Sequence, residues 1–385
     1  MSLSTDQWFA RPSARTWTCV PVPAEVREFH ASLDGYAPTP LTESPALASE
    51  LGVGRVFVKD ESSRLGLPAF KALGASWAVH RILSRRAPGS APVLLVTATD
   101  GNHGRAVARM ARLSGQRAHV FVAEGVHPAA VDAISDEGAR VTVVAGSYDE
   151  AVRRAASAAA EPGAVLVQDT SWPGYEEVPG WIVEGYSTLF AEVDAQLSAA
   201  GADPPGLVAV PVGVGSLAQA AVTHYRASPD ASNGTAWQDR TNGATRHDHR
   251  GRPAALLAVE PDVAACVLAS LTERRPVSVT TRPTSMAGLN CGTPSGLAWP
   301  YLLGGLDAAI TVTDADSARA ARDLAALGVS SGPCGAASLA GVRAALTGDA
   351  AGERRPALGV GPASTVVLLS TEGAAANPHT QGDDV

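Results

Sequence analysis

The chain has 385 residues, 45% of them hydrophobic and 18% charged, which is enough to bury the cores of about two or three globular domains. Its net charge of −8 argues against a basic surface for nucleic acid or for an anionic membrane. Residues 1–30 lack the apolar stretch of a signal peptide, and no segment reads as a transmembrane helix. We therefore expect a cytoplasmic protein.

Short apolar runs rich in β-branched residues alternate with Ala- and Arg-rich segments along the chain. The runs predict strands, and the segments between them predict helices that include 104–113, 128–137 and 148–159. Strands that alternate with helices indicate βαβ units and parallel sheets, so we expect an α/β fold. The predicted strands are 56–58, 93–97, 118–122, 141–144, 165–167, 207–211, 256–259 and 366–369.

A polar, Gly- and Asn-rich stretch at 228–253 interrupts this alternation and predicts a long, exposed and mobile insertion. It contains His247 and His249, but no cluster of cysteines or carboxylates accompanies them, so a solvated loop is the better interpretation than a metal site. The four cysteines form no CxxC pair, and we predict no metal. The tail at 374–385 reads as frayed.

Only two of the 30 basic Lys and Arg residues are lysines, Lys59 and Lys71. Where a positive charge is sufficient this chain uses arginine, so a lysine suggests a task that arginine cannot perform. One such task is the attack of a deprotonated amine on a carbonyl group. Lys71 is therefore a candidate Schiff-base residue, whereas Lys59 is interpreted as a member of an ion pair.

A glycine turn between a predicted strand and a helix is a candidate phosphate site. Gly213 and Gly215 let backbone N–H groups converge on an anion, and Ser216 adds a hydroxyl at the helix N-terminus. The turn lacks the Lys of a Walker loop and the third glycine of a dinucleotide fingerprint. An ordinary strand–helix turn with a helix cap is the alternative. Downstream of Lys71, however, it suggests the phosphate of a carbonyl cofactor.

A second turn, at 99–105, carries polar side chains after the strand at 93–97. The amide of Asn102 can donate to a phenolate oxygen or accept from a protonated one. Taken by itself, each of Asp100 and Asn102 is better interpreted as the N-cap of the following helix. His103 could act as a base, but packing at the helix start is the preferred interpretation.

Taken together, these segments resemble the tryptophan-synthase-β family of pyridoxal-phosphate enzymes, known as fold type II. The resemblance extends over about residues 35–375. Within the family, Asp100 and the sequence at 168–170 resemble the corresponding residues of the ammonia-lyases that act on 2,3-diaminopropionate. The phrases that carry the resemblance are 38–41, 58–62, 64–67, 69–74, 99–105, 168–172, 174–175, 184–186, 286–289, 291–292 and 370–373.

The resemblance implies a set of residues around pyridoxal 5'-phosphate. Lys71 would hold the cofactor as a Schiff base, and Asn102 would bind its 3' oxygen. Ser370, or Thr371 by one register, would meet the pyridine nitrogen. The phosphate would be wrapped by Gly213, Val214, Gly215 and Ser216.

The resemblance also implies a reaction and an architecture. The chain would be a carbon–nitrogen lyase that converts 2,3-diaminopropionate to pyruvate and ammonia by α,β-elimination. Lys71 and Asp100 would remove the α-proton from opposite faces, one for each enantiomer. Asp169 would orient the second ammonium of the substrate, with a strand-end cap as its alternative role.

The expected architecture has two three-layer, parallel-sheet domains with the cofactor between them. The small domain would comprise 82–172 and the large cofactor-binding domain 1–81 plus 173–385. A homodimer is implied as well. Cys266 and Cys291 fall where the relatives can carry a disulfide, although buried free thiols explain both equally well.

Some features depart from the family pattern and keep other functions open. The residues 216–219 after the glycine turn are larger than expected, and 297–300 lack the expected polar-then-glycine pattern. A serine/threonine dehydratase-like lyase for another β-substituted amino acid is the first alternative. A non-catalytic protein that binds pyridoxal phosphate is the alternative of another class.

Overall fold

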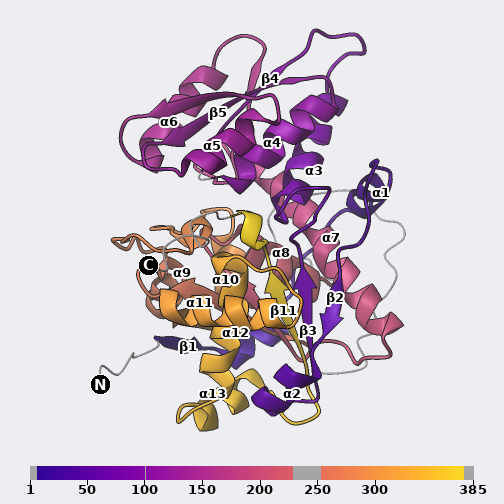
Figure 1. The fold of residues 1–385 in the computed structure, drawn as a ribbon, viewed down its shortest axis with the longest axis vertical. Helices are drawn as coiled ribbons and strands as arrows, with labels where there is room; N and C mark the ends of the chain where they lie inside the picture. The colour runs from indigo at the N-terminus through magenta and orange to yellow at the C-terminus, as the bar shows by residue number, and fades with distance from the viewer. Residues whose placement is uncertain (1–6, 100, 229–252, 377–385) are drawn as a thin grey trace.

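The computed structural model describes residues 7–99, 101–228 and 253–376 (Figure 1). Asp100 lies outside these residues, as do His247, His249 and all but the two ends of the predicted insertion. The remaining chain forms two sheets, each covered by helices on both faces, as expected for an α/β protein.

The larger sheet has seven strands, and its five inner strands run parallel. The two edge strands, β1 and β2, pair antiparallel with their neighbours. In spatial order the strands are β1 (Trp8–Ala10), β10 (Ala308–Val312), β9 (Ala255–Pro261), β8 (Leu207–Pro211), β11 (Thr365–Ser370), β3 (Arg55–Asp60) and β2 (Leu41–Glu43).

The smaller sheet has four parallel strands drawn at the top of Figure 1. Alternate residues of its strands face opposite helices, since side chains of a strand alternate between faces. Val120 packs in the core with α4, whereas Phe121 packs in another core with α6. In spatial order the strands are β6 (Arg140–Val144), β5 (Arg117–Ala123), β4 (Leu94–Thr99) and β7 (Ala164–Leu166).

Helices fill the outer layers, and most connect successive parallel strands. They are α1 (Glu25–Ala31), α2 (Pro45–Leu51), α3 (Lys71–Ser84), α4 (Asn102–Leu113), α5 (Pro128–Ser135), α6 (Tyr148–Ala159), α7 (Glu177–Ala199), α8 (Ser216–Tyr225), α9 (Cys266–Glu273), α10 (Trp299–Gly305), α11 (Asp314–Ala326), α12 (Pro333–Leu346) and α13 (Ala351–Leu358). Three short 3-10 helices are η1 (Pro12–Thr16), η2 (Ala287–Leu289) and η3 (Ala374–Ala376). Among the described helices, none is both long and apolar enough to span a bilayer.

Two glycines allow α3 to lie directly against α7. A Cβ on Gly74 would lie 2.5 Å from Cε1 of Tyr186, and a Cβ on Gly185 would lie 2.5 Å from the carbonyl oxygen of Leu73. Real side chains cannot approach this closely, so only glycine permits the contact. The close contact fixes the first turn of α3, which begins at Lys71, against the long helix α7.

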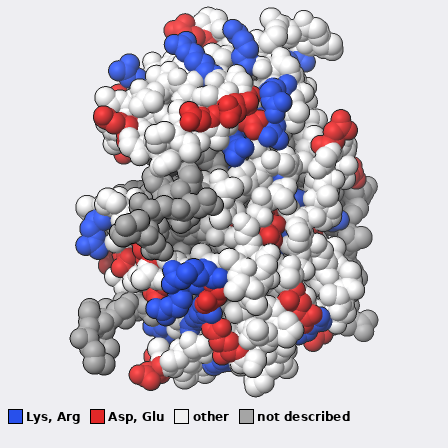
Figure 2. All heavy atoms as spheres, viewed as in Figure 1, with Lys and Arg blue, Asp and Glu red and all other residues white. Residues whose placement is uncertain are grey.

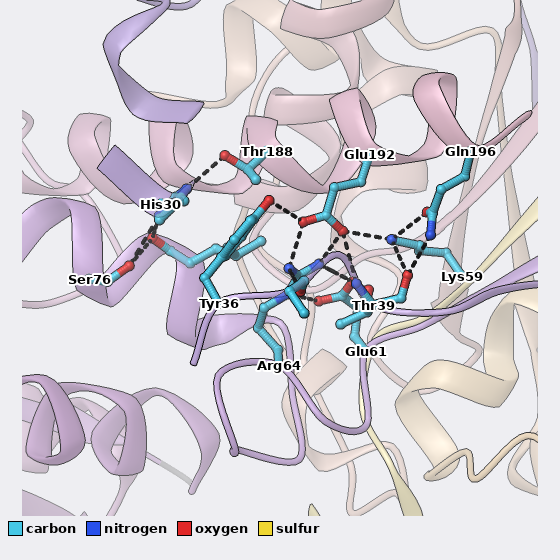
Figure 3. A network of polar contacts seen from close by, with 12 residues as sticks. His30, Tyr36, Thr39, Lys59, Glu61, Arg64, Ser76, Thr188, Glu192 and Gln196 are labelled. Carbon is cyan, nitrogen blue, oxygen red and sulfur yellow. Dashed lines mark hydrogen bonds and ion pairs between the residues drawn. The ribbon is translucent and has the colours of Figure 1, made fainter. Parts of the chain in front are cut away.

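Lys59 lies in a buried ionic network rather than at a site, which confirms its interpretation as an ion-pair residue (Figure 3). Its ammonium donates to Glu192 at 2.7 Å, to Gln196 at 2.8 Å and to the carbonyl oxygen of Thr39 at 2.7 Å. Arg64 contacts the same Glu192 and also Glu61. Two positive and two negative side chains therefore hold together β3, helix α7 and the loop that leads to Lys71.

The face shown in Figure 2 carries Lys, Arg, Asp and Glu side chains interspersed with one another. No single sign of charge dominates this face, in keeping with the modest net charge of −8.

Candidate active site

Lys71 begins α3 and forms an ion pair with Asp169, which follows β7. Their Nζ and Oδ2 atoms are 2.5 Å apart. Burial by itself would lower the pKa of Lys71, but the Asp169 carboxylate outweighs burial and raises this pKa above its ordinary value. Burial would raise the pKa of Asp169, but His103 and Lys71 hold it below the usual range. Each member of the pair therefore favours the charged form of the other.

His103 is buried at the start of α4, close to Asp169. Its Nε2 is 2.7 Å from the carbonyl oxygen of Val167, so this nitrogen carries a proton and donates it. The Nδ1 atom is 3.9 Å from Asp169 Oδ2, beyond hydrogen-bonding distance. Burial lowers the pKa of His103. The predicted packing of His103 at the helix start is thus confirmed.

The turn before α4 is held by Thr99 and not by Asn102. The Thr99 hydroxyl oxygen accepts the N–H groups of Gly101 and Gly104, both at 3.0 Å. The helix cap is Gly101, with a φ of 154° that favours glycine. The alternative role of Asn102 as a helix cap is therefore wrong. Its side chain instead donates from Nδ2 to Glu372 Oε2 at 2.7 Å.

The predicted phosphate turn links β8 to α8. Gly215 has a φ of 103°, which a side chain would strain, and the carbonyl oxygen of Val214 accepts the N–H of Ser295 at 2.8 Å. Within the described part of the chain, the backbone N–H groups of residues 213–216 donate to no protein acceptor. Such free donors at a helix N-terminus are suited to an anion. The Ser216 hydroxyl lies 3.3 Å from the carbonyl oxygen of Asp169, which brings this turn next to the Lys71 pair.

Two cysteines, neither in a disulfide, border this turn. Cys266 Sγ lies 3.7 Å from the carbonyl oxygen of Gly213. A Cβ on Gly213 would lie 2.9 Å from Cys291 Sγ. Glycine at 213 therefore leaves room for the Cys291 thiol beside the turn.

Ser370 ends β11 and is fully buried, with its Oγ donating to Ser331 Oγ at 2.9 Å. The carbonyl oxygen of Thr371 accepts the N–H of Phe70 at 3.1 Å, one residue before Lys71. A Cβ on Gly335 would lie 3.0 Å from Ser370 Oγ and 2.9 Å from the Thr371 nitrogen. The fold thus places both candidates for the pyridine contact beside the start of α3.

Two residues near the candidate site had no role assigned from the sequence. Tyr186 is fully buried on α7 and lies beside the Lys71 amine. Glu372 contacts Asn102, as described above. Both belong to phrases that carry the family resemblance, at 184–186 and 370–373, and that was the one available signal. Neither contact is visible in the sequence, because Tyr186 reaches Lys71 through the packing of α7 against α3. Glu372 is 270 residues from Asn102 in sequence.

These groups fit a phosphate-bearing carbonyl cofactor. Lys71 offers the amine, the turn at 213–216 offers unused N–H donors, and Asn102 lies at the start of the neighbouring helix α4. Such a set of an amine, an anion cradle and a polar contact is what a pyridoxal-phosphate site requires.

Residues 33–371 match the family described as pyridoxal-phosphate dependent enzyme, and the chain belongs to this family. Its sheets and its solved neighbours are those of fold type II. Pyridoxal phosphate is therefore its cofactor, and small amino acids are its class of substrate.

Particular relatives are ammonia-lyases. The diaminopropionate ammonia-lyase of Salmonella typhimurium is 35% identical over 325 residues, 78% of this chain and 75% of the relative. The structure of the Escherichia coli diaminopropionate ammonia-lyase in complex with an aminoacrylate-PLP azomethine reaction intermediate superposes with a TM-score of 0.83 at 30% identity, covering 97% of this chain and 95% of that one. The L-threonine ammonia-lyase of Geobacter sulfurreducens is 31% identical over 49% of this chain and 42% of its own length.

Proposed function

We propose that this chain is an ammonia-lyase that converts 2,3-diaminopropionate to pyruvate and ammonia by α,β-elimination. The observation that carries the proposal is the ion pair between Lys71 and Asp169. A carboxylate already positioned to bind an ammonium beside the reactive amine suits a substrate with a second amino group. Serine and threonine lack that group. The similarity to diaminopropionate ammonia-lyases over most of the chain supports the same substrate.

The residues that would hold the cofactor follow from their contacts. Lys71 would supply the amine, and Asn102 would contact the 3' oxygen. Ser370 or Thr371 would meet the pyridine nitrogen, and the N–H groups and hydroxyl of residues 213–216 would bind the phosphate. When bound, pyridoxal phosphate supplies a carbonyl for the amine and a ring that acidifies the α-proton of an amino acid.

Lys71 and Asp100 divide the proton transfers in this proposal. Lys71 removes the α-proton of one enantiomer, and Asp100 removes it from the other face. Asp169 binds the second ammonium of the substrate and so orients the leaving β-amine. Because Asp169 holds its proton weakly, it presents a negative charge to that ammonium at neutral pH.

The domain division, the assembly and the location are part of the same proposal. The small domain is 82–172 and the large domain 1–81 plus 173–385, which assigns each of the two sheets to its own unit. The enzyme works as a homodimer in the cytoplasm. Sedimentation of the purified chain tests the dimer, and a mass of one chain would contradict it.

A substrate panel tests the proposed reaction. The purified protein is supplied with D- and L-2,3-diaminopropionate, serine and threonine, and pyruvate, 2-ketobutyrate and ammonia are measured. We expect two ammonia molecules for each pyruvate from diaminopropionate, because the aminoacrylate product hydrolyses and releases the second amine. A higher kcat/KM for serine or threonine than for diaminopropionate would contradict the proposal.

A dehydratase for serine or threonine is the second candidate. The similarity to the L-threonine ammonia-lyase of Geobacter sulfurreducens favours it, although that similarity covers about half of this chain. The same panel separates the two, because a dehydratase releases one ammonia for each keto acid and turns over threonine to 2-ketobutyrate.

A further inference from the structure

Glu372 is a buried carboxylate with partners from distant parts of the chain. Glu372 lies two residues after the end of β11 and is 4% exposed. Its Oε1 accepts the N–H of Cys334 in the first turn of α12 at 3.2 Å, and its Oε2 accepts from Asn102 Nδ2 at 2.7 Å. The carboxylate thus joins the larger sheet to α4, the helix that begins with the candidate cofactor residue Asn102.

The backbone around Glu372 holds its side chain in one place. Glu372 pairs with Ala69, two residues before Lys71, and its carbonyl oxygen accepts the N–H of Gly332 at 2.9 Å. A Cβ on Gly332 would lie 2.9 Å from Glu372 Oε1 and 3.0 Å from the carbonyl oxygen of Gly373, so a larger residue there would displace the carboxylate. Burial raises the pKa of Glu372, while hydrogen bonds from Cys334 and Asn102 oppose that increase.

The chemistry of the contact removes a freedom that the Asn102 amide would otherwise have. An amide has a donating NH₂ end and an accepting oxygen end, and a rotation of the side chain by half a turn exchanges them. A carboxylate only accepts, so Asn102 must turn its NH₂ end toward Glu372. The opposite orientation would set two acceptor oxygens against each other in a buried place, which is unfavourable.

We propose that Glu372 is a positioning residue that locks the Asn102 amide in one of its two orientations and thereby sets the hydrogen bond which Asn102 offers to the cofactor. The proposal rests on the contact between Asn102 and the cofactor in the function proposed above. In this proposal Glu372 is not itself a cofactor contact, and it acts only through Asn102.

A single substitution, Glu372→Gln, inverts this arrangement without removing hydrogen bonds. The N–H of Cys334 is a fixed donor, and the Cys334 thiol also faces this carboxylate. The oxygen of the new Gln must therefore stay on the Cys334 side, and its NH₂ group must face Asn102. Asn102 then turns its oxygen toward residue 372 and offers the cofactor the reverse pattern of donor and acceptor.

The test is a double-mutant cycle that needs no amino-acid substrate. Glu372→Gln, Asn102→Ala and the combined variant are freed of cofactor and titrated with pyridoxal phosphate, and the absorbance of the Lys71-bound cofactor reports Kd and the band position. We expect Glu372→Gln to weaken binding about tenfold and to shift the band. In the Asn102→Ala background, the same substitution should change Kd by less than about twofold and leave the band in place.

Glu260→Gln is the matched control. Glu260 is also fully buried, and its carboxylate accepts the N–H groups of Val267 and Leu268 at 2.8 and 2.7 Å at the start of α9. The Glu260→Gln substitution should lower thermal stability. Its effect on the Kd for pyridoxal phosphate should be the same with Asn102 and with Ala at position 102.

Two results would overturn the proposal. Equal weakening by Glu372→Gln in both backgrounds, including loss of folding in both, would mean that the carboxylate serves only to hold α12. An unchanged Kd and band would mean that Asn102 keeps its function in either orientation. Since no diaminopropionate is present, failure here is separate from failure of the proposed reaction, which the substrate panel reports.

Discussion

The ammonium of Lys71 lies 2.5 Å from the carboxylate of Asp169, although 98 residues separate them in sequence. A protonated amine cannot attack a carbonyl group, so Lys71 must give up this proton before it can form a Schiff base with the cofactor. When Lys71 gives up its charge, Asp169 is left as an unpaired carboxylate beside the site. In the proposed function Asp169 then accepts the second ammonium of the substrate, and this exchange of partners would select a diamino acid.

Asp169→Asn should therefore affect a diamino acid more than a hydroxy amino acid. We expect KM for 2,3-diaminopropionate to rise about tenfold, because a hydrogen bond between two charges is lost, while KM for serine changes little. Steady-state kinetics with both substrates measure the difference. Asp132→Asn, an exposed position on α5, is the control. Equal increases for the two substrates would leave Asp169 with its alternative role as a strand-end cap.

Lys71→Arg should separate the charge of Lys71 from its chemistry. Arginine keeps the pair with Asp169 but cannot form a Schiff base. The absorbance band of the Schiff base between residue 71 and the cofactor should vanish in both Lys71→Arg and Lys71→Ala. The alanine variant should in addition lose about 1–3 kcal/mol of unfolding free energy, since Asp169 is left without its partner. A band that persists in either variant would contradict the assignment of Lys71.

Asp100→Asn tests the two-base hypothesis, which rests on the family resemblance. Removing a general base commonly costs about 100-fold or more in rate. We expect that loss of kcat/KM for one enantiomer of 2,3-diaminopropionate and a much smaller loss for the other. Similar losses for D and L substrate would show that a single base serves both faces.

Most of the strands could be predicted from the pattern, because parallel strands are short, apolar and rich in β-branched residues. All eight predicted strands are present as β3 to β9 and β11. The strands β1 and β2 were missed because each has three residues and neither contains valine or isoleucine, whereas β7, equally short, contains Val165. The strand β10 (Ala308–Val312) was missed because alanine, which begins it, has a low preference for strands.

The sequence could predict candidate site residues whose own chemistry is unusual. It could not predict residues whose role depends on their neighbours in the fold. Lys71 and the turn at 213–216 stand out by residue type alone. The partner of Asn102 does not, because Glu372 reaches it across 270 residues and only the folded chain brings the two together. Tyr186 lies beside Lys71 because Gly74 lets its ring approach, which again is a tertiary effect.

Glu192→Gln should destabilise the fold strongly. Glu192 is the shared acceptor of Lys59 and Arg64, each within 2.7 Å, and all three side chains are buried (Figure 3). Removing one charge from a buried ion pair leaves the others uncompensated and costs about 3–5 kcal/mol. Denaturant unfolding measures the change. Glu43→Gln is the matched control, since Glu43 pairs with Arg55 at the surface, where solvent screens the two charges and the pair contributes little. Equal losses of unfolding free energy in Glu192→Gln and Glu43→Gln would contradict a stabilising role of the buried network.

Glu137→Gln should flatten the acid dependence of stability. Burial opposes the charge of Glu137, but hydrogen bonds from Arg109 and Arg112 outweigh it and lower its pKa from 4.5 to about 2. A carboxyl whose pKa is lower in the folded chain stabilises the fold above its unfolded pKa. That contribution is lost as the pH falls from 4.5 toward 2.

In that window the wild-type unfolding free energy should fall more steeply than that of Glu137→Gln, by at most about 1.4 kcal/mol for each pH unit. Urea unfolding at several pH values gives both slopes. Arg112→Gln should give an intermediate slope, since Arg112 is half exposed and Arg109 still holds the carboxylate. Identical slopes for wild type and Glu137→Gln would mean that the two arginines do not hold the Glu137 charge in solution.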